Sequence, residues 1–349
     1  MLSYTKLHDK VVPLVQRMVY AQNWDILLSF GKERVSMAKK VNILLSTYNG
    51  EKYIEEQLES VFTQTYSNIY LYIRDDGSTD ATVEKIRQYL KKFPERASRT
   101  RWIPNETNEN IGYMQSFWKL LELASGADYY AFCDQDDVWL PEKVESGVKR
   151  LECEGQENLD LPLLYFSNFY QCNQDLSDKR EGRIYLEPIE FENVLFYTPA
   201  FGFTILINEN LRQLVLRKFN HDGLPHDGWI QKVAAAFGKI FYDPRCMAYY
   251  RRHENAVTVS NANKGSLAKN WIRNEIIGAS MQKTHDVLVR FFQIYGDEMK
   301  DQDRKKLEIY ATRKRNLAIW LRRVGFREHL RPSVGGRMAL RICFFLGRY

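Results

Sequence analysis

The sequence predicts an α/β fold: a doubly wound, mostly parallel sheet with helices on both faces, followed by a C-terminal helical extension. Between residues 41 and 155, short apolar runs that end in polar loops alternate with stretches of helical periodicity. From residue 266 onward the pattern is helical to the end, apart from an interruption near residues 332–336. Alternation of this kind is typical of parallel sheets, whose ligands bind beyond the carboxyl ends of the strands.

The elements follow from these patterns in chain order. In the first part, we expect strands at residues 41–46, 69–73, 102–103 and 129–133, and helices at 53–64, 80–90 and 113–123. Pro141 begins a further helix, because proline suits the first helical turn. The middle part is less regular, and we expect strands at 163–167, 203–207 and 239–242, a loop at 173–193 and a helix at 229–237.

Composition restricts the class of protein. A chain of 349 residues with 44% hydrophobic and 27% charged residues can bury a large core. No apolar run reaches the roughly 18 residues of a transmembrane helix, and no secretion signal is recognisable at the start. The five cysteines are scattered without a CxxC pair, which favours reduced thiols over a zinc site. We therefore expect a cytoplasmic protein.

Three regions are predicted: an N-terminal helical extension at 1–39, a catalytic domain at 40–263 and a basic helical region at 264–349. In the first, Leu7, Val11, Leu14, Val15 and Met18 fit one helix face, which would pack on the body or on a partner. Met37 directly precedes the first strand and resembles a natural start, so the extension could instead be dispensable. No internal repeat is present.

Charge is unevenly distributed. Residues 304–349 contain 13 Lys/Arg and two Glu, a net charge of +11, which leaves about −5 for the rest because the chain carries +6. Apolar and aromatic residues interleave with arginines there, as in helices that lie on anionic membranes. A helical hairpin packed on the core or on a second subunit is the alternative. No nucleic-acid-binding motif accompanies the basic charge, so nucleic acid is not expected as a partner.

Carboxylates gather in three places. Asp75 and Asp76 follow the second strand, Asp134, Asp136 and Asp137 follow a later one, and His226-Asp227 opens a helix. Carboxylates are costly to desolvate, so their presence at strand ends suggests a cation to hold or a proton to accept. The sequence alone thus points to an enzyme that acts on a nucleotide-linked substrate.

The first two strand ends have the features of a base site. In Ser46-Thr47-Tyr48-Asn49-Gly50, the tyrosine can stack on a planar base, although Asn-Gly also marks an ordinary turn. A carboxylate of Asp75-Asp76 could accept the N3–H of uracil or thymine. The alternative for this loop is helix capping by Ser78 or Asp80.

The third strand end suits a metal. Acids that alternate after a buried strand, as in Asp134-Gln135-Asp136-Asp137, suit Mg²⁺ or Mn²⁺ shared with a diphosphate. Solvated loop acids are the alternative. Asp227 could be a base or only a helix cap, and His253, beside Arg252, could reach a metal or lie on the surface.

Over residues 40–260, the order of these motifs resembles the family 2 glycosyltransferases of GT-A fold, and more narrowly bacterial rhamnosyltransferases of cell-wall or capsular polysaccharide synthesis. The resemblance rests on Thr-Tyr-Asn-Gly, Asp-Asp-Gly-Ser-Thr-Asp, Asp-Gln-Asp-Asp-Val-Trp-Leu-Pro, His-Asp-Gly-Trp and Tyr-Arg-Arg-His. It implies inverting transfer of a sugar, with dTDP-β-L-rhamnose as the best candidate donor, to a lipid-linked or oligosaccharide acceptor at the inner face of the cell membrane.

The resemblance also implies roles for individual residues. Asp227 would be the general base and Asp136 a direct metal ligand, with His253 facing the metal or the diphosphate. The residues that would bind the nucleotide sugar are Ser46, Thr47, Tyr48, Asn49, Asp75, Asp76, Asn110, Gly112, Asp134, Gln135, Asp137 and Arg252. Those placed at the acceptor are Trp139, Gly202, Phe203, His226 and Trp229. Phe203 stands where the family often has cysteine, and the 39-residue start is a second departure.

Other functions remain open from the sequence. A UDP-hexose or UDP-N-acetylhexosamine would suit the same motifs, because uracil and thymine both offer an N3–H. An oxidoreductase would need a GxGxxG after the first strand, and Ser46–Gly50 is not one. A nucleotidyltransferase would usually show a Gly-rich phosphate loop there. A non-catalytic scaffold of a polysaccharide assembly complex would be expected to lose Asp136 or Asp227, and both are present. A homo-oligomer is also open.

Overall fold

The computed structural model describes residues 38–155, 160–185, 187–217, 221–252, 280–314 and 316–349. By its internal contacts the chain divides into two units, Met1–Lys39 and Lys40–Tyr349. The helix expected over residues 7–18 and the side chain of His253 lie outside the described residues. All elements named below belong to the second unit, and the C-terminal helices fall into it as well.

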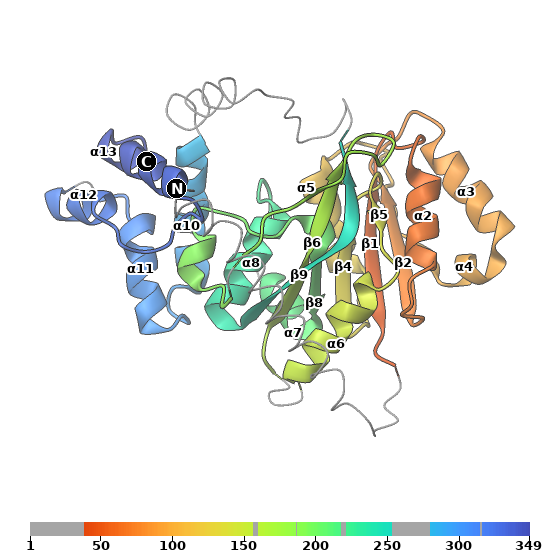
Figure 1. The fold of residues 1–349 in the computed structure, drawn as a ribbon, viewed down its shortest axis with the longest axis horizontal. Helices are drawn as coiled ribbons and strands as arrows, with labels where there is room; N and C mark the ends of the chain where they lie inside the picture. The colour runs from red at the N-terminus through yellow and green to blue at the C-terminus, as the bar shows by residue number, and fades with distance from the viewer. Residues whose placement is uncertain (1–37, 156–159, 186, 218–220, 253–279, 315) are drawn as a thin grey trace, which may run out of the picture. The chain divides into compact units, whose positions relative to one another are not determined.

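A nine-stranded sheet, counted over the described residues, forms the centre of this unit in the order β3-β2-β1-β4-β8-β6-β9-β5, with β7 paired to β6 (Figure 1). Neighbours from β3 to β4 are parallel, as are β6 and β9, whereas β8 and β5 pair antiparallel with their neighbours. The strands are β1 Val41–Thr47, β2 Ile69–Asp75, β3 Thr100–Trp102, β4 Tyr129–Cys133, β5 Val138–Trp139, β6 Leu163–Cys172, β7 Arg180–Glu181, β8 Ile205–Asn208 and β9 Lys239–Arg251.

This arrangement confirms the predicted α/β fold. β4 is buried along its whole length and β1 at all but one position, as expected when helices cover both faces of parallel strands. β6 and β9 are longer than predicted because the residues beyond their predicted ends pair with each other through a bulged register. The two-residue β5 carries too few residues for a sequence pattern and was not predicted.

Helices lie on both faces of the sheet (Figure 1). They comprise α2 Ile54–Phe62, α3 Thr82–Lys92, α4 Pro94–Ser98, α5 Tyr113–Leu123, α6 Lys143–Gly155, α7 Glu209–Val215 and α8 His226–Phe237, with short 3₁₀ helices η1 Phe191–Val194 and η2 Gly202–Thr204. On one face Gly147 of α6 lies so close to Tyr165 and Leu206 that a Cβ would stand 2.8 Å from the leucine. Residues of α5 and α8 pack with Leu164 and Ile205 in the core on the other face.

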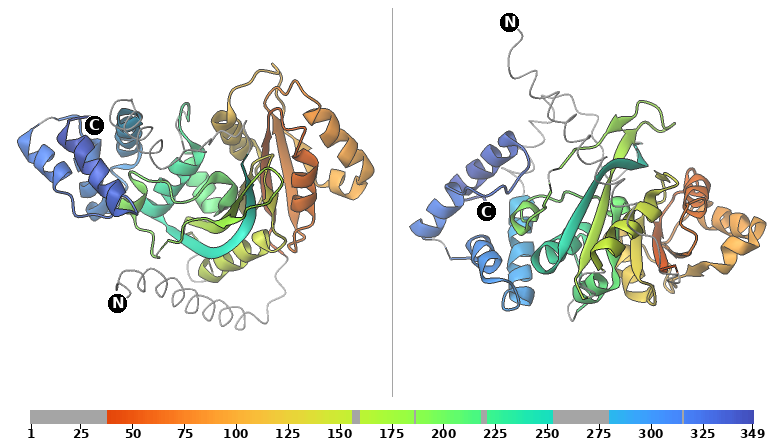
Figure 2. Two further views of the ribbon diagram at one scale, coloured as in Figure 1. Left: turned by 45° about the horizontal axis from the view of Figure 1, so that its top comes forward. Right: turned by 60° about the horizontal axis from the view of Figure 1, so that its bottom comes forward.

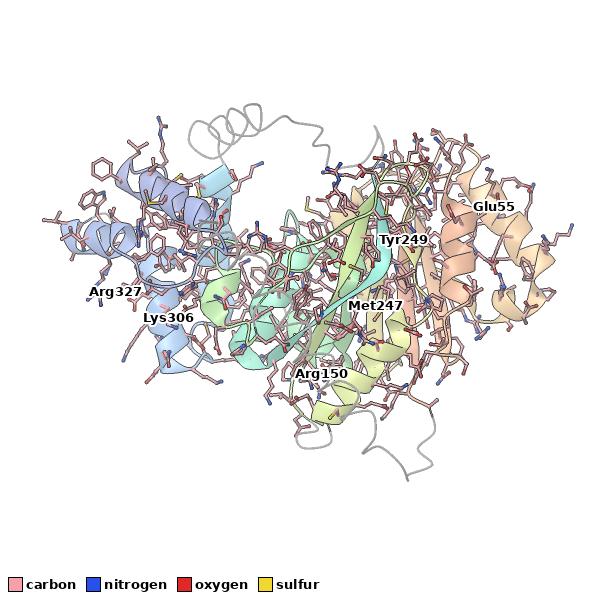
Figure 3. The ribbon with its side chains drawn as sticks, viewed as in Figure 1. Glu55, Arg150, Met247, Tyr249, Lys306 and Arg327 are labelled. Atoms are coloured by element: carbon pink, nitrogen blue, oxygen red, sulfur yellow. The ribbon has the colours of Figure 1, made fainter. Side chains whose placement is uncertain are left out.

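The C-terminal helices belong to the same hydrophobic core as α5 and α8. They are α10 Ser280–Tyr295, α11 Asp301–Ala311, α12 Leu317–Val324 and α13 Val334–Phe345. The ring of Trp229 on α8 lies 5.2 Å from that of Phe291 on α10, and Lys306 on α11 forms a 2.7 Å ion pair with Glu192 of η1. Figure 3 labels Lys306 on this group of helices, and the two views of Figure 2 show the group beside the end of the sheet that carries α8.

Two of these helices expose apolar side chains. α13 presents Val334, Met338, Ile342, Phe345 and Leu346 at 44–69% exposure, and α12 presents Leu317 and Leu321 at 70% and 55%. The spacing of these residues places them along one helix face in each case. No helix of the described ranges is both long and apolar enough to cross a membrane.

Candidate active site

The candidate site lies where β1, β2 and β4 end. The parallel register sets Thr47 beside Asp75 and Leu45 beside Cys133, so the loops that follow these strands leave the same edge of the sheet. The structure thus brings together the motifs that follow β1, β2 and β4, which contain Tyr48, Asp76 and Asp136.

Hydrogen bonds connect the loops to one another. The backbone N–H of Tyr48 donates to Gln135 Oε1 and Gln135 Nε2 donates to the carbonyl of Tyr48, both at 2.8 Å. Asn49 joins the loop after β2, because its N–H donates to Ser78 Oγ at 2.9 Å and its Oδ1 accepts from the N–H of Thr79 at 2.8 Å. Gln135 and Asn49 therefore hold the site together, while the Tyr48 ring stays 46% exposed beside them.

Asp75 and Asp76 are both engaged within the protein. Asp75 Oδ1 accepts from the hydroxyls of Thr47 at 2.8 Å and Ser78 at 2.6 Å. Asp76 is 1% exposed and forms a 2.6 Å ion pair with the buried Arg74.

The loop that precedes α5 also binds Asp76. The N–H of Ile111 donates to Asp76 Oδ1 at 3.0 Å, and the N–H of Gly112 donates to Oδ2 at 2.8 Å. The sequence interpretation had Asp76 accept a base N3–H, but in the folded chain its oxygens face inward and hold this loop. Direct contact with a base would require the surroundings of Asp76 to open, because this residue is only 1% exposed. Asn110 is exposed and accepts from the N–H of Gly112 at 3.0 Å.

Ser46 lies one layer below the loops. Its hydroxyl donates to Ser116 Oγ on α5 at 2.6 Å, and Arg74 donates to the same oxygen at 3.1 Å. Ser46 therefore connects β1 to α5.

Negative charge concentrates around Asp134. Burial raises the pKa of Asp134 to about 7, and the nearby charges of Asp136 and Asp227 add to this shift. Burial, with the charges of Asp136 and Asp134, also raises the pKa of Asp137 well above its usual range. The helix that carries Asp227 thus brings the third acidic motif to the second, about 90 residues earlier in the chain.

These acids fit a divalent cation. The Asp137 side chain is fully buried, and its Oδ2 has no hydrogen-bond partner in the described structure. An orphaned buried carboxylate oxygen beside further carboxylates is a costly arrangement that a bound cation would relieve. Within the described ranges, no three His, Cys, Asp or Glu side chains converge at the spacing of a metal site. A metal ion held by Asp136 and its neighbours would therefore need further ligands besides these side chains.

Arg251 and Tyr113 also belong to the site, although their roles were not predicted. Arg251 is 4% exposed, and its guanidinium donates to the carbonyl of Asp136 at 2.9 Å and pairs with Glu56 at 2.5 Å. Arg252, which was predicted to bind the nucleotide sugar, continues β9 by donating its N–H to the carbonyl of Cys172 at 2.9 Å. The motif Tyr-Arg-Arg-His offers both arginines, but only the strand register shows which one points inward.

Tyr113 begins α5 directly after Gly112. Burial raises the pKa of its hydroxyl, and the charges of Asp227 and Asp134 reinforce the shift. The hydroxyl of Tyr113 therefore lies near Asp227 and Asp134.

Asp227 lies in the first turn of α8. Its Oδ1 accepts from the N–H of Gly228 at 2.6 Å, so the helix start orients the carboxylate. The preceding His226 is 4% exposed and packs at a tilt against the rings of Phe117 and Phe132, at ring-centroid distances of 4.5 and 4.9 Å. Burial lowers the pKa of His226, which favours a neutral ring.

Most of the predicted acceptor residues are buried. The exposed fractions of Trp139, Phe203 and Trp229 are 2%, 2% and 1%. Trp139, Phe203 and His226 lack the free surface that contact with an acceptor needs, so they pack beneath the site, whereas Trp229 also lines a cavity together with Pro225 and Gly228. Gly202 lies directly against His226, and a Cβ there would stand 2.7 Å from Nε2.

Comparison with known proteins agrees with this geometry. Residues 42–201 match the family model described as "Glycosyl transferase family 2". This match assigns residues 42–201 to a family 2 glycosyltransferase domain. An uncharacterized glycosyltransferase of Haemophilus influenzae is 27% identical over 242 residues, which cover 68% of this chain and 73% of that protein. A dTDP-rhamnosyl transferase of Shigella flexneri, RfbG, is 26% identical over 252 residues, covering 66% of this chain and 82% of that protein.

Solved structures show the same fold. Residues 1–349 of S. aureus TarS superpose with a TM-score of 0.52 at 15% identity, covering 88% of this chain and 82% of that chain. The same protein in complex with UDP-GlcNAc gives a TM-score of 0.51 at 16% identity and covers 89% of this chain and 93% of that chain. The predicted GT-A fold of the family 2 domain is thereby confirmed.

Proposed function

We propose that this glycosyltransferase is an inverting, metal-dependent enzyme that moves a sugar from a nucleotide donor to an acceptor hydroxyl. The observation that carries the proposal is the crowding of Asp134, Asp136, Asp137 and Asp227 at the carboxyl ends of the strands, beside the exposed ring of Tyr48. Such crowding is costly unless a cation and a proton acceptor are needed there.

In this proposal, the base of the donor stacks on Tyr48 and its sugar lies near Asp134 and Asp137. L-Rhamnose from dTDP-β-L-rhamnose is the best candidate, supported by the likeness to a dTDP-rhamnosyl transferase. At 26% identity, donors with UDP and a hexose or N-acetylhexosamine remain the alternative.

The chemistry follows from where the carboxylates lie. Asp227 removes the proton from the acceptor hydroxyl, and the oxygen attacks the anomeric carbon on the side opposite the diphosphate. The oxygen–carbon bond forms as the carbon–phosphate-oxygen bond breaks, which inverts the centre. Asp134 and Asp137 place carboxyl oxygens near a ring that becomes cationic, and a cation bound beside them would favour their ionised form. Bound Mg²⁺ or Mn²⁺, held by Asp136 with His253 and its neighbours as further candidate ligands, would neutralise charge on the leaving diphosphate.

Donor turnover tests the proposal. The purified chain is incubated with Mn²⁺ or Mg²⁺, a rhamnose-terminated lipid-like acceptor and a panel of dTDP- and UDP-sugars, and released nucleoside diphosphate is measured. Release from dTDP-rhamnose alone supports the rhamnosyltransferase. Release from a UDP-sugar instead keeps the chemistry and replaces the sugar. If no donor is bound or turned over, the chain is better explained as a scaffold subunit of a polysaccharide assembly complex.

We also propose that α12 and α13 bind an anionic membrane surface, which would place the enzyme at the inner face of the cell membrane near a lipid-linked acceptor in cell-wall or capsular synthesis. Their exposed apolar faces adjoin the exposed Arg322, Arg341 and Arg348. Over residues 312–349 only Glu328 opposes ten Lys/Arg, so the charge suits anionic lipid headgroups.

Liposome flotation tests this surface. The chain should float with vesicles that contain phosphatidylglycerol and not with pure phosphatidylcholine. Ile342→Asp, at 44% exposure on α13, should weaken flotation, whereas Leu123→Asp, at 51% exposure on α5, should not. Equal flotation of the two variants would contradict the proposal, and dimerisation lost only in Ile342→Asp would assign the surface to a second subunit.

A further inference from the structure

A large cavity lies between the family 2 domain and the C-terminal helices. Its volume is about 1020 Å³, and it lies beside the proposed base, because Pro225 and Gly228 on either side of Asp227 line it. None of the roles assigned to the acidic site uses this cavity. A volume of this size holds a small-molecule ligand.

The charged side chains that line the cavity are all cationic. They are Arg183, Lys232, Lys283 and Arg331, and among the described residues no Asp or Glu lines the cavity. Four cations without a carboxylate in one cavity favour an anion. The cations come from four separate parts of the chain, so the grouping is a product of the fold and not of a basic run in the sequence.

Lys232 is the strongest indication of a ligand. Its side chain is only 7% exposed, and its Nζ donates to the carbonyl of Gly228 at 3.3 Å. Burial lowers the pKa of Lys232 to about 8, with the charge of Asp227 acting in the opposite direction. An ammonium has three N–H donors, so this buried group has donors to offer a ligand.

Two helix N-termini also reach the cavity. α8 begins at its edge, and Ser333 and Gly336 bring the first turn of α13 to it. Helix N-termini favour phosphate and other anions through their dipole, although the N–H groups of Gly228 and Gly336 already donate to Asp227 Oδ1 and Ser333 Oγ. Leu195, Phe196 and Val287 give the cavity an apolar part, and Thr198, Ser280 and Thr284 add hydroxyl groups to its lining.

We infer that this cavity binds the phosphate or diphosphate group of an amphiphilic acceptor, with the apolar part of the acceptor along the Phe196 wall. The cations would hold the anion while the acceptor hydroxyl lies at Asp227. This inference rests on the proposed function, since it gives the acceptor of that reaction its chemical class. α13 carries an exposed apolar face, and its first turn lines the cavity, so an acceptor from a membrane would meet both.

Binding of farnesyl diphosphate to the full chain tests the inference, with farnesol and inorganic pyrophosphate as matched probes. Fluorescence of Trp229, which lines the cavity, or calorimetry reports binding. Farnesyl diphosphate should bind at least about 10-fold more tightly than farnesol, as expected for charged hydrogen bonds. Equal affinity of the two would overturn the inference. Pyrophosphate binding as tight as farnesyl diphosphate would overturn the amphiphilic ligand and leave a site for free anions.

Charge reversal locates the binding. Lys283→Glu, an exposed position on α10, should weaken farnesyl diphosphate binding by about 10-fold. Lys305→Glu, an exposed position on α11 outside the cavity, is the control and should bind as the parent does. Equal affinity of the two variants for farnesyl diphosphate would contradict binding in this cavity.

UDP and dTDP titrations are run in parallel on both variants. Nucleotide binding that persists in Lys283→Glu, with the lipid affinity lost, separates the cavity from the donor site. If the parent protein binds neither nucleotide, the proposed function is wrong. If it binds a nucleotide but not farnesyl diphosphate, only this inference is wrong.

Discussion

Asp76→Asn should destabilise the protein more than any other change in the loop after β2. The carboxylate is 1% exposed and pairs at 2.6 Å with Arg74, which is itself only 4% exposed. Asparagine removes the negative charge, so the buried guanidinium keeps only neutral acceptors, such as the amide oxygen and Ser116 Oγ at 3.1 Å. Removal of one partner of a buried ion pair costs about 3–5 kcal/mol.

The loop before α5 loses support as well. Two N–H groups, of Ile111 and Gly112, donate to separate oxygens of Asp76, and asparagine retains one oxygen. One of these two backbone N–H groups then faces the NH₂ group of the asparagine and loses its hydrogen bond. This loss is part of the same ~3–5 kcal/mol of unfolding free energy, because the contacts of Asp76 are coupled. At roughly 2 °C per kcal/mol for a unit of this size, the melting temperature should fall by about 6–10 °C.

Urea unfolding of Asp76→Asn beside Asp75→Asn measures the difference. Asp75 binds only hydroxyls and one backbone N–H, so its replacement should cost about 1 kcal/mol. If Asp76→Asn unfolds at the same midpoint as the parent and yet loses affinity for UDP or dTDP, the buried structural role of Asp76 is wrong. Asp76 would then contact the base directly.

Three further results are expected. Tyr48→Ala should weaken nucleotide binding by about 5- to 100-fold, as expected for lost base stacking. Tyr48→Phe keeps the aromatic ring and should retain binding. Unchanged nucleotide affinity in Tyr48→Ala would show that Tyr48 does not contact the base. Gly202→Ala should destabilise by about 1–3 kcal/mol in urea unfolding, because its Cβ would stand 2.7 Å from His226 Nε2. Adding His226→Ala should recover part of this loss, and strictly additive effects would rule out the contact. Chelation by EDTA should abolish donor turnover and Mn²⁺ or Mg²⁺ should restore it, whereas turnover that persists in EDTA would exclude the metal role of Asp136.

The sequence was sufficient for the parallel half of the fold. Buried strands such as Tyr129–Cys133 leave a continuous apolar run, and polar loops mark their carboxyl ends. The second half of the sheet was harder, because β5 has two residues and β9 alternates only over part of its length. Pairing between distant strands decides these elements, and no local pattern records it.

At the site, the sequence identified residue types better than their contacts. It grouped Asp134, Asp136 and Asp227 as functional, and the fold brings them together. It could not show that Asp76 faces inward to Arg74, or that Trp229 is buried in the core, because both depend on which way a side chain points. The cavity around Lys232 draws its cations from four segments, so no motif contains it.

Replacement of Asp227 tests the central claim most directly. Asp227→Asn keeps the size of the side chain and an oxygen for the N–H of Gly228, which now donates to Asp227 Oδ1 at 2.6 Å. Asp301→Asn, an exposed position in the first turn of α11, is the matched control. With the donor that the parent turns over, Asp227→Asn should lower transfer by at least about 100-fold, as expected for loss of a general base, and leave nucleotide binding intact. Transfer at a near-normal rate in Asp227→Asn would contradict the account.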